Sequence, residues 1–139
     1  MKRNWDLIRD ILLMADGRNL ELIKADLSDF GYTESAVDFH LAILGSGEGD
    51  AGFIKTECKL VDGETIFHMD TLMRVGMTKE VALHRTWKGE EFKELVSDAE
   101  LWKSIKAICR RQDIPLSETA IRTLADRSLM AVIKVSTAP

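Results

Sequence analysis

The sequence lacks any uninterrupted apolar segment of the kind that a signal peptide or a membrane span contains. The N-terminal stretch MKRNWDLIRDILLMAD has charged residues inside its apolar run. No later stretch approaches the roughly 20 apolar residues that a membrane helix needs. These absences predict a cytoplasmic protein that does not enter a membrane.

Cysteine and histidine are scarce and have no ligand spacing. Cys58 and Cys109 stand alone, without the CxxC pairs of a zinc site or the even set of a disulfide framework. The three histidines, His40, His68 and His84, match neither HExxH nor HxH. We therefore predict buried reduced thiols, a packed and hydrogen-bonded His40, and no metal site.

Catalytic signatures are also missing. There is no GxSxG elbow, no P-loop and no dinucleotide fingerprint. The loop from Gly45 to Gly52 holds four glycines, but it carries Glu48 and Asp50 where a phosphate cradle needs positive charge. The sequence thus predicts no catalytic residue, no cofactor and no enzymatic activity.

The composition of the chain is that of an ordinary folded domain. Its 139 residues are 45% apolar and 30% charged, enough for one core with an appended helical tail. We predict a domain over residues 1–96 and a helical extension over 97–139 that packs on it.

Capping residues and periodicity place the elements of the first part. Asn4 caps a helix from about Trp5 to Asp16, which Gly17 closes and which buries Trp5, Ile8, Ile11, Leu12 and Ala15. Residues 19–24 fit either a strand or a helical turn, and a short helix is expected within 25–32. Thr33 caps a helix over 34–44 that Gly45 stops. Its Val37, Leu41 and Leu44 face the core, with His40 beside them.

An alternating segment then predicts a β-hairpin. Ile54, Thr56, Cys58 and Leu60 face one side of a strand over 53–60, and Phe53, Lys55, Glu57 and Lys59 face the other. Asp62-Gly63 is a turn signal, and Thr65–Met69 supplies the returning strand. Residues 70–80 are ambiguous between a second wing and a loop. A short strand is expected at 81–84.

Helices follow to the end of the chain. Thr86 caps one in which Trp87 and Phe92 are predicted core anchors. Ser97 and Glu100 form a capping box for the next, and Ser117 caps the last. The segment SLMAVIKV near the end is apolar on more than one face, so it either joins the core or is covered by a partner, as in a homodimer through this helix.

The motifs in this order resemble a known family. The opening MKRNWDLIRDILL, the VDFHLAIL helix followed by AGFIK, and the TWKGEEF helix start are similar to those of a family of bacterial and phage proteins catalogued as a domain of unknown function. The resemblance covers residues 1–106 and implies a winged helix and occurrence on phages or prophages. This chain departs from the pattern by inserting GSGEGD and by having Arg85 where a leucine is expected.

Helix, glycine-rich loop and strand in succession favour an α+β fold: a winged helix-turn-helix with a small antiparallel hairpin wing and additional C-terminal helices. In such folds one helix enters the DNA major groove. Here the helix over 34–44 has no Lys, Arg, Asn or Gln, the residues that bind phosphate and read bases. Its outer stripe is Glu34, Asp38 and Ala42, and residues 1–50 contain five Lys and Arg against ten Asp and Glu.

Three interpretations of this charge pattern stay open. The preferred one is a protein-binding regulator or inhibitor of a host factor, which uses Glu34, Asp38, Glu48 and Asp50. Its partner is a host or phage protein, and a nucleic-acid-binding host factor with a basic groove would fit these carboxylates. The alternative is a DNA-binding transcriptional regulator whose wing and N-terminus contact DNA through Lys2, Arg3, Lys55 and Lys59. In the third, the acidic stripe is simply a solvated helix face.

Overall fold

The structure of the protein is a computed structural model that describes residues 2–45, 50–60, 65–66 and 78–137. Side chains are described for all of these except residues 59–60, 65–66, 78–79 and 128–137. The fold is α+β, and the described residues form helices and one four-stranded antiparallel sheet. The chain divides into two compact units, residues 1–92 and 93–139.

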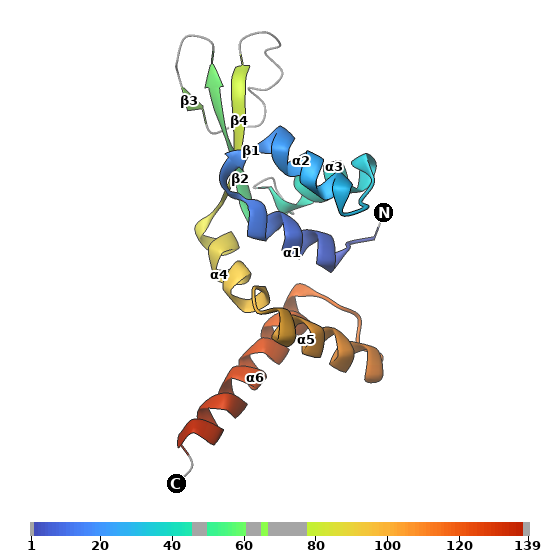
Figure 1. Cartoon of the computed structure of the whole chain (residues 1–139). Helices are drawn as coiled ribbons and strands as arrows, with labels where there is room; N and C mark the ends of the chain where they lie inside the picture. Colours follow the sequence, from blue (N-terminus) through green and yellow to red (C-terminus); the bar gives the residue numbers. More distant parts are fainter. Residues whose placement is uncertain (1, 46–49, 61–64, 67–77, 138–139) are drawn as a thin grey trace. The chain divides into compact units, whose positions relative to one another are not determined.

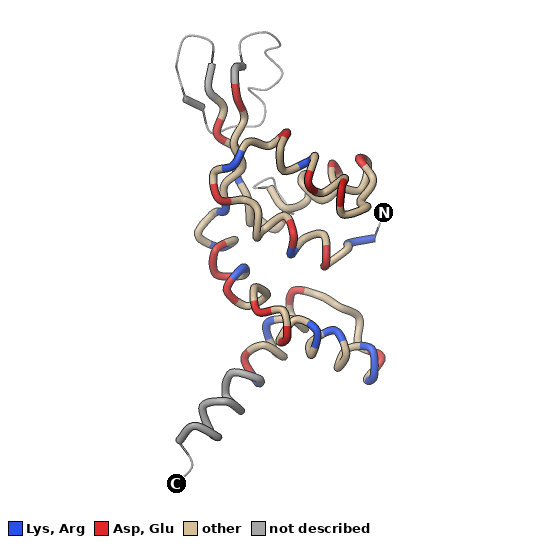
Figure 2. Tube along the Cα trace, viewed as in Figure 1, with Lys and Arg blue, Asp and Glu red and all other residues tan. Residues whose placement is uncertain are grey.

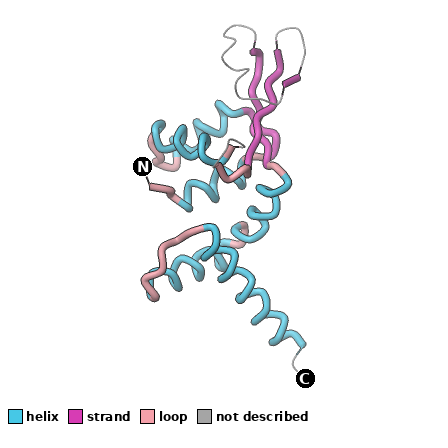
Figure 3. Tube along the Cα trace, turned by 180° about the vertical axis from the view of Figure 1, so that it is seen from behind, coloured by secondary structure: helices cyan, strands magenta, loops and turns pink. Residues whose placement is uncertain are grey.

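The first unit contains three helices and the sheet (Figures 1 and 3). In chain order its elements are α1 (Trp5–Met14), β1 (Asp16–Asn19), α2 (Leu20–Asp29), α3 (Glu34–Leu44), β2 (Ile54–Leu60), β3 (Thr65–Ile66) and β4 (Thr78–Arg85). Helix α4 (Trp87–Val96) begins in this unit and continues into the second. The domain boundary expected after residue 96 remains a prediction, as does the packing of the extension on the first domain.

Side-chain caps determine where these helices begin. Asn4 accepts a hydrogen bond from the Leu7 amide at 3.2 Å, and Thr33 accepts one from the Ala36 amide at 3.2 Å, so both predicted caps are confirmed. Asn19 caps α2 in the same way, which makes the undecided residues 20–24 the start of that helix. The prediction for Gly17 is wrong: with φ at 95° it lies within β1 and does not close α1.

The sheet has the strand order β1-β4-β2-β3, with every neighbouring pair antiparallel. The predicted alternation along β2 is confirmed where side chains are described, since Ile54, Thr56 and Cys58 are buried and Lys55 is exposed. The prediction for Phe53 is wrong. This residue precedes the strand, so the alternation does not govern it, and its ring is fully buried against Phe92 at a centroid distance of 4.8 Å.

The returning strand β3 pairs with β2 at its far end, Cys58 opposite Ile66 and Lys59 opposite Thr65. The predicted turn at 62–63, residues 67–69 and most of the ambiguous segment 70–80 lie outside the described residues. The strand expected at 81–84 is longer and runs from Thr78 to Arg85, so the last residues of that segment belong to β4.

Helix α1 contributes more buried apolar side chains to the core of the first unit than any other element that the structure describes. All five residues predicted to form its inner face are buried: Trp5, Ile8, Ile11, Leu12 and Ala15. On α3, Val37, His40 and Leu44 are buried, whereas Leu41 is half-buried. Phe92 is buried as expected.

Trp87, by contrast, is 84% exposed, and the prediction that it anchors the core is wrong. It is the first residue of α4, and the inner side of that helix is taken by Gly89 and Phe92, which leaves Trp87 on the outer side with Glu91.

The second unit contains α5 (Ala99–Arg111) and α6 (Glu118–Thr137) (Figure 1). Its buried apolar side chains include Trp102, Ile105, Cys109, Ile121 and Ala125. Asp98 caps α5 by accepting from the Leu101 amide at 2.9 Å, so the predicted cap at Ser97 is wrong by one residue, because an aspartate one residue later can take that position. Ser117 caps α6 as expected, accepting from the Ala120 amide.

Candidate functional site

The outer side of α2 and α3 is an acidic groove of about 310 Å³. Glu34 and Asp38, one turn apart on α3, line it together with Glu21 from α2, and both α3 residues are exposed. The spacing of Glu34 and Asp38 on α3 predicted that they share one face, whereas Glu21 reaches the same groove only through the packing of α2 against α3. Figure 2 shows the acidic residues along these helices.

One cation lies among these carboxylates. Lys24 on α2 forms an ion pair with Asp38 at 3.3 Å, and both side chains remain substantially exposed. A surface pair of this kind contributes at most about 1 kcal/mol to stability, so Lys24 can turn away without large cost. A basic partner can therefore compete with Lys24 for Asp38.

The acidic residues predicted in the glycine-rich loop are placed only in part. Asp50 is exposed, and the next residue, Ala51, donates its amide to the Ile43 carbonyl, so Asp50 lies beside the C-terminal turn of α3. Glu34 lies at the opposite end of that helix, roughly 15 Å away at 1.5 Å per residue. Glu48 lies outside the described residues.

Tyr32 lines the same groove and is held by α1. Its hydroxyl donates a hydrogen bond to Asp10 at 2.8 Å. Burial, and secondly the hydrogen bond to Asp10, raise the pKa of this phenol well above its ordinary value. Tyr32 thus ties this wall of the groove to α1, and its phenol stays protonated under ordinary conditions.

His40 is packed and hydrogen-bonded, as predicted. Its Nε2 accepts from the Asn4 amide at 2.7 Å, and its Nδ1 lies 2.7 Å from the Ala36 carbonyl. Because a carbonyl can only accept, Nδ1 carries the hydrogen and the ring is neutral. Both ring nitrogens are engaged, so His40 holds the start of α1 against α3 and is not placed to serve a ligand.

The outward face of the sheet carries mixed charges. Lys55 is exposed on β2, but the same face holds Glu57, whose carboxylate lies 3.1 Å from His84 Nε2 on β4 without hydrogen-bond geometry. At the far end of β2, Lys59 is in register with Glu80. The two predicted wing lysines therefore lie next to carboxylate-bearing positions, while Lys2 and Arg3 are exposed before α1.

The thiols offer no reactive group. Cys58 and Cys109 are free and buried, as predicted, and burial raises the pKa of the Cys58 thiol. Among the described residues, no three His, Cys, Asp or Glu side chains are grouped so that they could hold a metal ion. No helix in the described part of the chain is both long enough and apolar enough to span a membrane.

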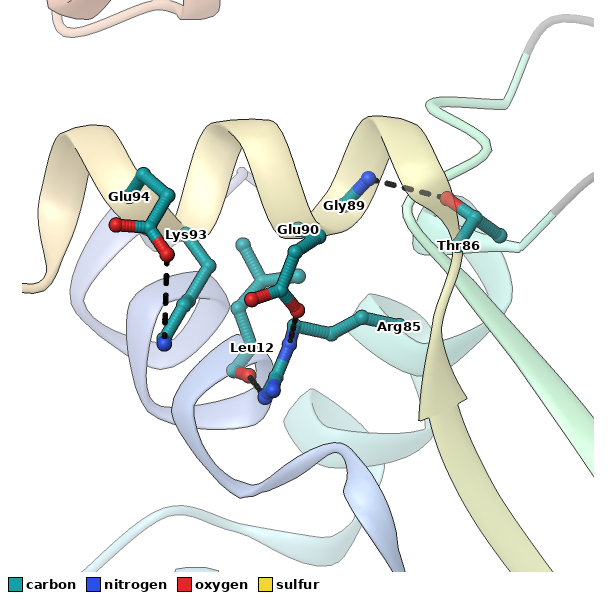
Figure 4. Close-up of polar contacts among 7 residues, drawn as sticks. All are labelled: Leu12, Arg85, Thr86, Gly89, Glu90, Lys93 and Glu94. Carbon is teal, nitrogen blue, oxygen red and sulfur yellow. Dashed lines mark hydrogen bonds and ion pairs between the residues drawn. The ribbon is translucent and has the colours of Figure 1, made fainter.

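The first turn of α4 is fixed by a dense set of contacts, of which the sequence predicted only the Thr86 cap (Figure 4). Thr86 caps the helix, accepting from the Gly89 amide at 3.0 Å and donating to the Gly52 carbonyl at 2.6 Å. Its own amide donates to the Phe53 carbonyl. Gly89 packs so closely on Phe53 that a Cβ there would overlap the Phe53 backbone.

Arg85 completes this arrangement from the end of β4. Its guanidinium donates to Glu90 on α4 and to the Leu12 carbonyl in the last turn of α1, the latter at 2.7 Å. A cation on a free carbonyl at a helix C-terminus is favourable for the helix dipole as well as for the hydrogen bond. Arg85 thus joins β4, α4 and α1.

Comparison with known proteins agrees with the motif resemblance. Residues 2–114 match the family described as "Hypothetical protein (DUF2513)". The chain belongs to this family. A relative from Haemophilus influenzae, described as "Uncharacterized protein", is 30% identical over 127 residues, which cover 90% of this chain and 92% of the relative. No solved structure matches the chain.

Proposed function

We propose that this chain is a non-enzymatic winged-helix protein of phage or prophage type that regulates or inhibits a host factor by binding it through an acidic face. The partner is itself a nucleic-acid-binding protein, and its basic groove accepts the carboxylates of Glu34, Asp38, Glu48 and Asp50. The observation that carries the proposal is the exposed side of α3, which offers carboxylates and no Lys, Arg, Asn or Gln.

The order and pairing of the elements support the winged-helix part of the proposal. A helix, a short strand, two further helices and a hairpin follow one another. Strand β1 pairs with β4, which is the last strand in chain order, and β4 also pairs with β2. In a DNA-binding winged helix, α3 would be the helix that enters the major groove. Since fold alone does not determine the ligand, we use the charge on α3 to choose between DNA and a protein.

That charge favours a protein over DNA. Two carboxylates on the exposed side of α3, with Glu21 beside them, would face the phosphates of a duplex and repel it. The same carboxylates would attract a surface rich in Lys and Arg and accelerate its association. The tie between Tyr32 and Asp10 holds one wall of the groove in place before any partner arrives.

The test is capture of a partner from a bacterial host lysate with the tagged chain, with and without nuclease. We expect a stoichiometric protein that survives nuclease treatment. Reversal of all four carboxylates, Glu34→Lys, Asp38→Lys, Glu48→Lys and Asp50→Lys, should abolish its capture, and the two α3 substitutions should weaken it. Unchanged capture by the fourfold variant would refute the proposal.

A matched control separates the site from net charge. The pair Glu94→Lys and Asp126→Lys makes the same charge change as the two α3 substitutions but lies within residues 93–139. This control should capture the partner as well as the native chain does. Equal losses in both double variants would mean that capture depends on total charge and not on α3.

The second candidate is a DNA-binding transcriptional regulator that uses Lys2, Arg3, Lys55 and Lys59. The exposure of Lys55 on β2 favours it, although Glu57 and His84 share that face. It predicts binding to a defined DNA site that weakens steeply with salt. Lys55→Ala with Lys59→Ala should then reduce the slope of log affinity against log salt by about 2, since each phosphate contact contributes about 0.9.

A further inference from the structure

Trp87 is the most exposed large apolar side chain among the described residues. It is 84% exposed, whereas Trp5 and Trp102 are 7% and 3% exposed. A tryptophan side chain has a large, mostly apolar surface, and leaving it in water forgoes the stabilisation that burial would give. Exposed tryptophan is also the residue type most enriched among the energetic centres of protein interfaces. The exposed indole is therefore accessible to a ligand.

The backbone beneath Trp87 is held rigidly. The preceding residue, Thr86, is bonded through both its amide and its hydroxyl to the segment at residues 52–53. Two residues later, Gly89 contacts the Phe53 backbone directly. Because these contacts hold the first turn of α4 against residues 52–53, they set where Trp87 is presented to solvent.

The side chain itself is also oriented. The indole Nε1–H donates a hydrogen bond to the Glu91 carboxylate at 3.0 Å, one turn further along α4. This bond restricts rotation of the ring in the free protein, so a partner that binds the ring has less side-chain freedom to freeze. It also satisfies the one polar group of the indole and leaves the aromatic faces open.

We infer that Trp87 and Glu91 form a docking site for a cationic side chain, an arginine or a lysine in a basic protein segment. The face of an indole ring attracts a cation within about 6 Å through its quadrupole. The Glu91 carboxylate at the edge of the ring adds a second, ionic attraction to the same cation. Residues 1–92 as a whole carry eleven Lys and Arg against seventeen Asp and Glu, a balance of −6 that draws a basic segment toward this unit.

The same geometry disfavours a nucleobase as the ligand. An exposed tryptophan can stack on a base, but the attached phosphates would then lie near the Glu91 carboxylate and within a negative field. The site lies on α4, whereas the proposed acidic face lies on α2 and α3. The inference therefore goes beyond the proposed function and stands without it.

Because Trp87 is exposed, quenching of its fluorescence can report on binding at this site. The neutral quencher acrylamide should reach Trp87 freely, while the buried Trp5 and Trp102 are protected, so the accessible part of the emission reports on one residue. The probes are a peptide of alternating arginine and glycine, a glutamate and glycine peptide of equal length, and a single-stranded oligonucleotide. We expect the arginine peptide alone to shield Trp87. Shielding by the oligonucleotide instead, or no shielding by the arginine peptide, would overturn the inference.

Variants then test both members of the pair, with a fluorescein-labelled arginine peptide and anisotropy as the measurement. Trp87→Ala should weaken binding about tenfold, in the range expected for loss of a cation–π contact and part of its surroundings. Trp87→Phe should retain part of the affinity. Glu91→Gln keeps an acceptor for the indole but removes the charge, and should weaken binding severalfold. Equal affinity of Trp87→Ala and the native chain would overturn the inference.

Two controls distinguish this site from general acidity and from the groove on α2 and α3. Asp126→Asn removes one negative charge within residues 93–139 and should bind the peptide normally. Glu34→Gln with Asp38→Asn should leave the shielding of Trp87 intact. If that pair abolishes the shielding, the peptide binds the acidic groove and the assignment to Trp87 is wrong. If the pair abolishes partner capture but not the shielding, the two sites are separate.

Discussion

Tyr32 donates its hydroxyl hydrogen to Asp10 across 2.8 Å and so joins the segment between α2 and α3 to helix α1. Burial of the phenol is the larger cause of its raised pKa, and the hydrogen bond to Asp10 is the next. The ionised form would lose the hydrogen that makes this bond and would face a carboxylate. The fold therefore favours the neutral phenol strongly.

Because Tyr32 is the single tyrosine of the chain, near-ultraviolet absorbance of phenolate follows it directly. We expect its midpoint well above the ordinary value of about 10. Asp10→Asn should lower that midpoint without restoring the ordinary value, since burial remains. With the folded pKa raised, this group's contribution to stability is complete below about pH 10 and is lost as pH rises further. A native, folded chain with a midpoint near 10 would contradict this.

Gly89→Ala should destabilise the protein although alanine is the better helix former. By propensity alone the change would stabilise an exposed helix by about 1 kcal/mol. Here the new Cβ would overlap the Phe53 backbone, which cannot move without breaking its bond from the Thr86 amide. We expect a loss of about 2–4 kcal/mol in the free energy of unfolding, measured with urea. Ser104→Ala, at an exposed position of α5, is the control and should change stability by less than about 0.5 kcal/mol.

Arg85→Ala should destabilise the first unit by about 2–3 kcal/mol. The side chain is only 14% exposed, and its removal leaves the Leu12 carbonyl and the Glu90 carboxylate without this donor. Arg85→Lys should recover only part of the loss, because one ammonium cannot reproduce the two directions of the guanidinium. Urea unfolding followed by circular dichroism measures both variants. Equal stability of the lysine variant and the native chain would show that charge alone matters at this position.

Trp87→Ala and Phe92→Ala should differ sharply despite their proximity in the sequence. Phe92 is 1% exposed and stacks on Phe53, so its truncation should cost about 3–5 kcal/mol. Trp87 contacts solvent, and its truncation should change stability by less than about 0.5 kcal/mol. Thermal unfolding of the two variants checks the order. A large loss in Trp87→Ala would place that ring in the core after all.

The contrast between these two aromatic residues shows what sequence patterns could and could not predict. Caps and periodicity placed α1 and α3, because Asn4 and Thr33 each accept a hydrogen bond from an amide three residues away. Such local contacts are visible in the sequence. The orientation of Trp87 depended instead on which side of α4 meets Phe53, and that contact spans more than thirty residues.

In the candidate site too, local relationships could be predicted from the sequence and contacts between distant elements could not. Glu34 and Asp38 could be assigned to one exposed stripe because both lie on α3, one turn apart. Glu21 could not be added, since it reaches the groove only through the packing of α2 on α3. The role of Arg85 was equally hidden, because its partner carbonyl at Leu12 is 73 positions away. Contacts between distant elements carry no periodic signal in a single sequence.

His40→Leu should destabilise the protein by about 2–3 kcal/mol even though leucine fills a similar volume. The imidazole accepts from the Asn4 amide at 2.7 Å, and leucine would leave that amide without its acceptor in a place where the ring excluded water. The comparison variant is His84→Leu, whose side chain is about one third exposed and whose Nε2 makes no hydrogen bond, and its cost should stay below about 1 kcal/mol. Urea unfolding of both variants at one pH gives the difference. If His40→Leu is as stable as the native chain, His40 serves as an apolar filler, and the start of α1 is held by the Asn4 cap alone.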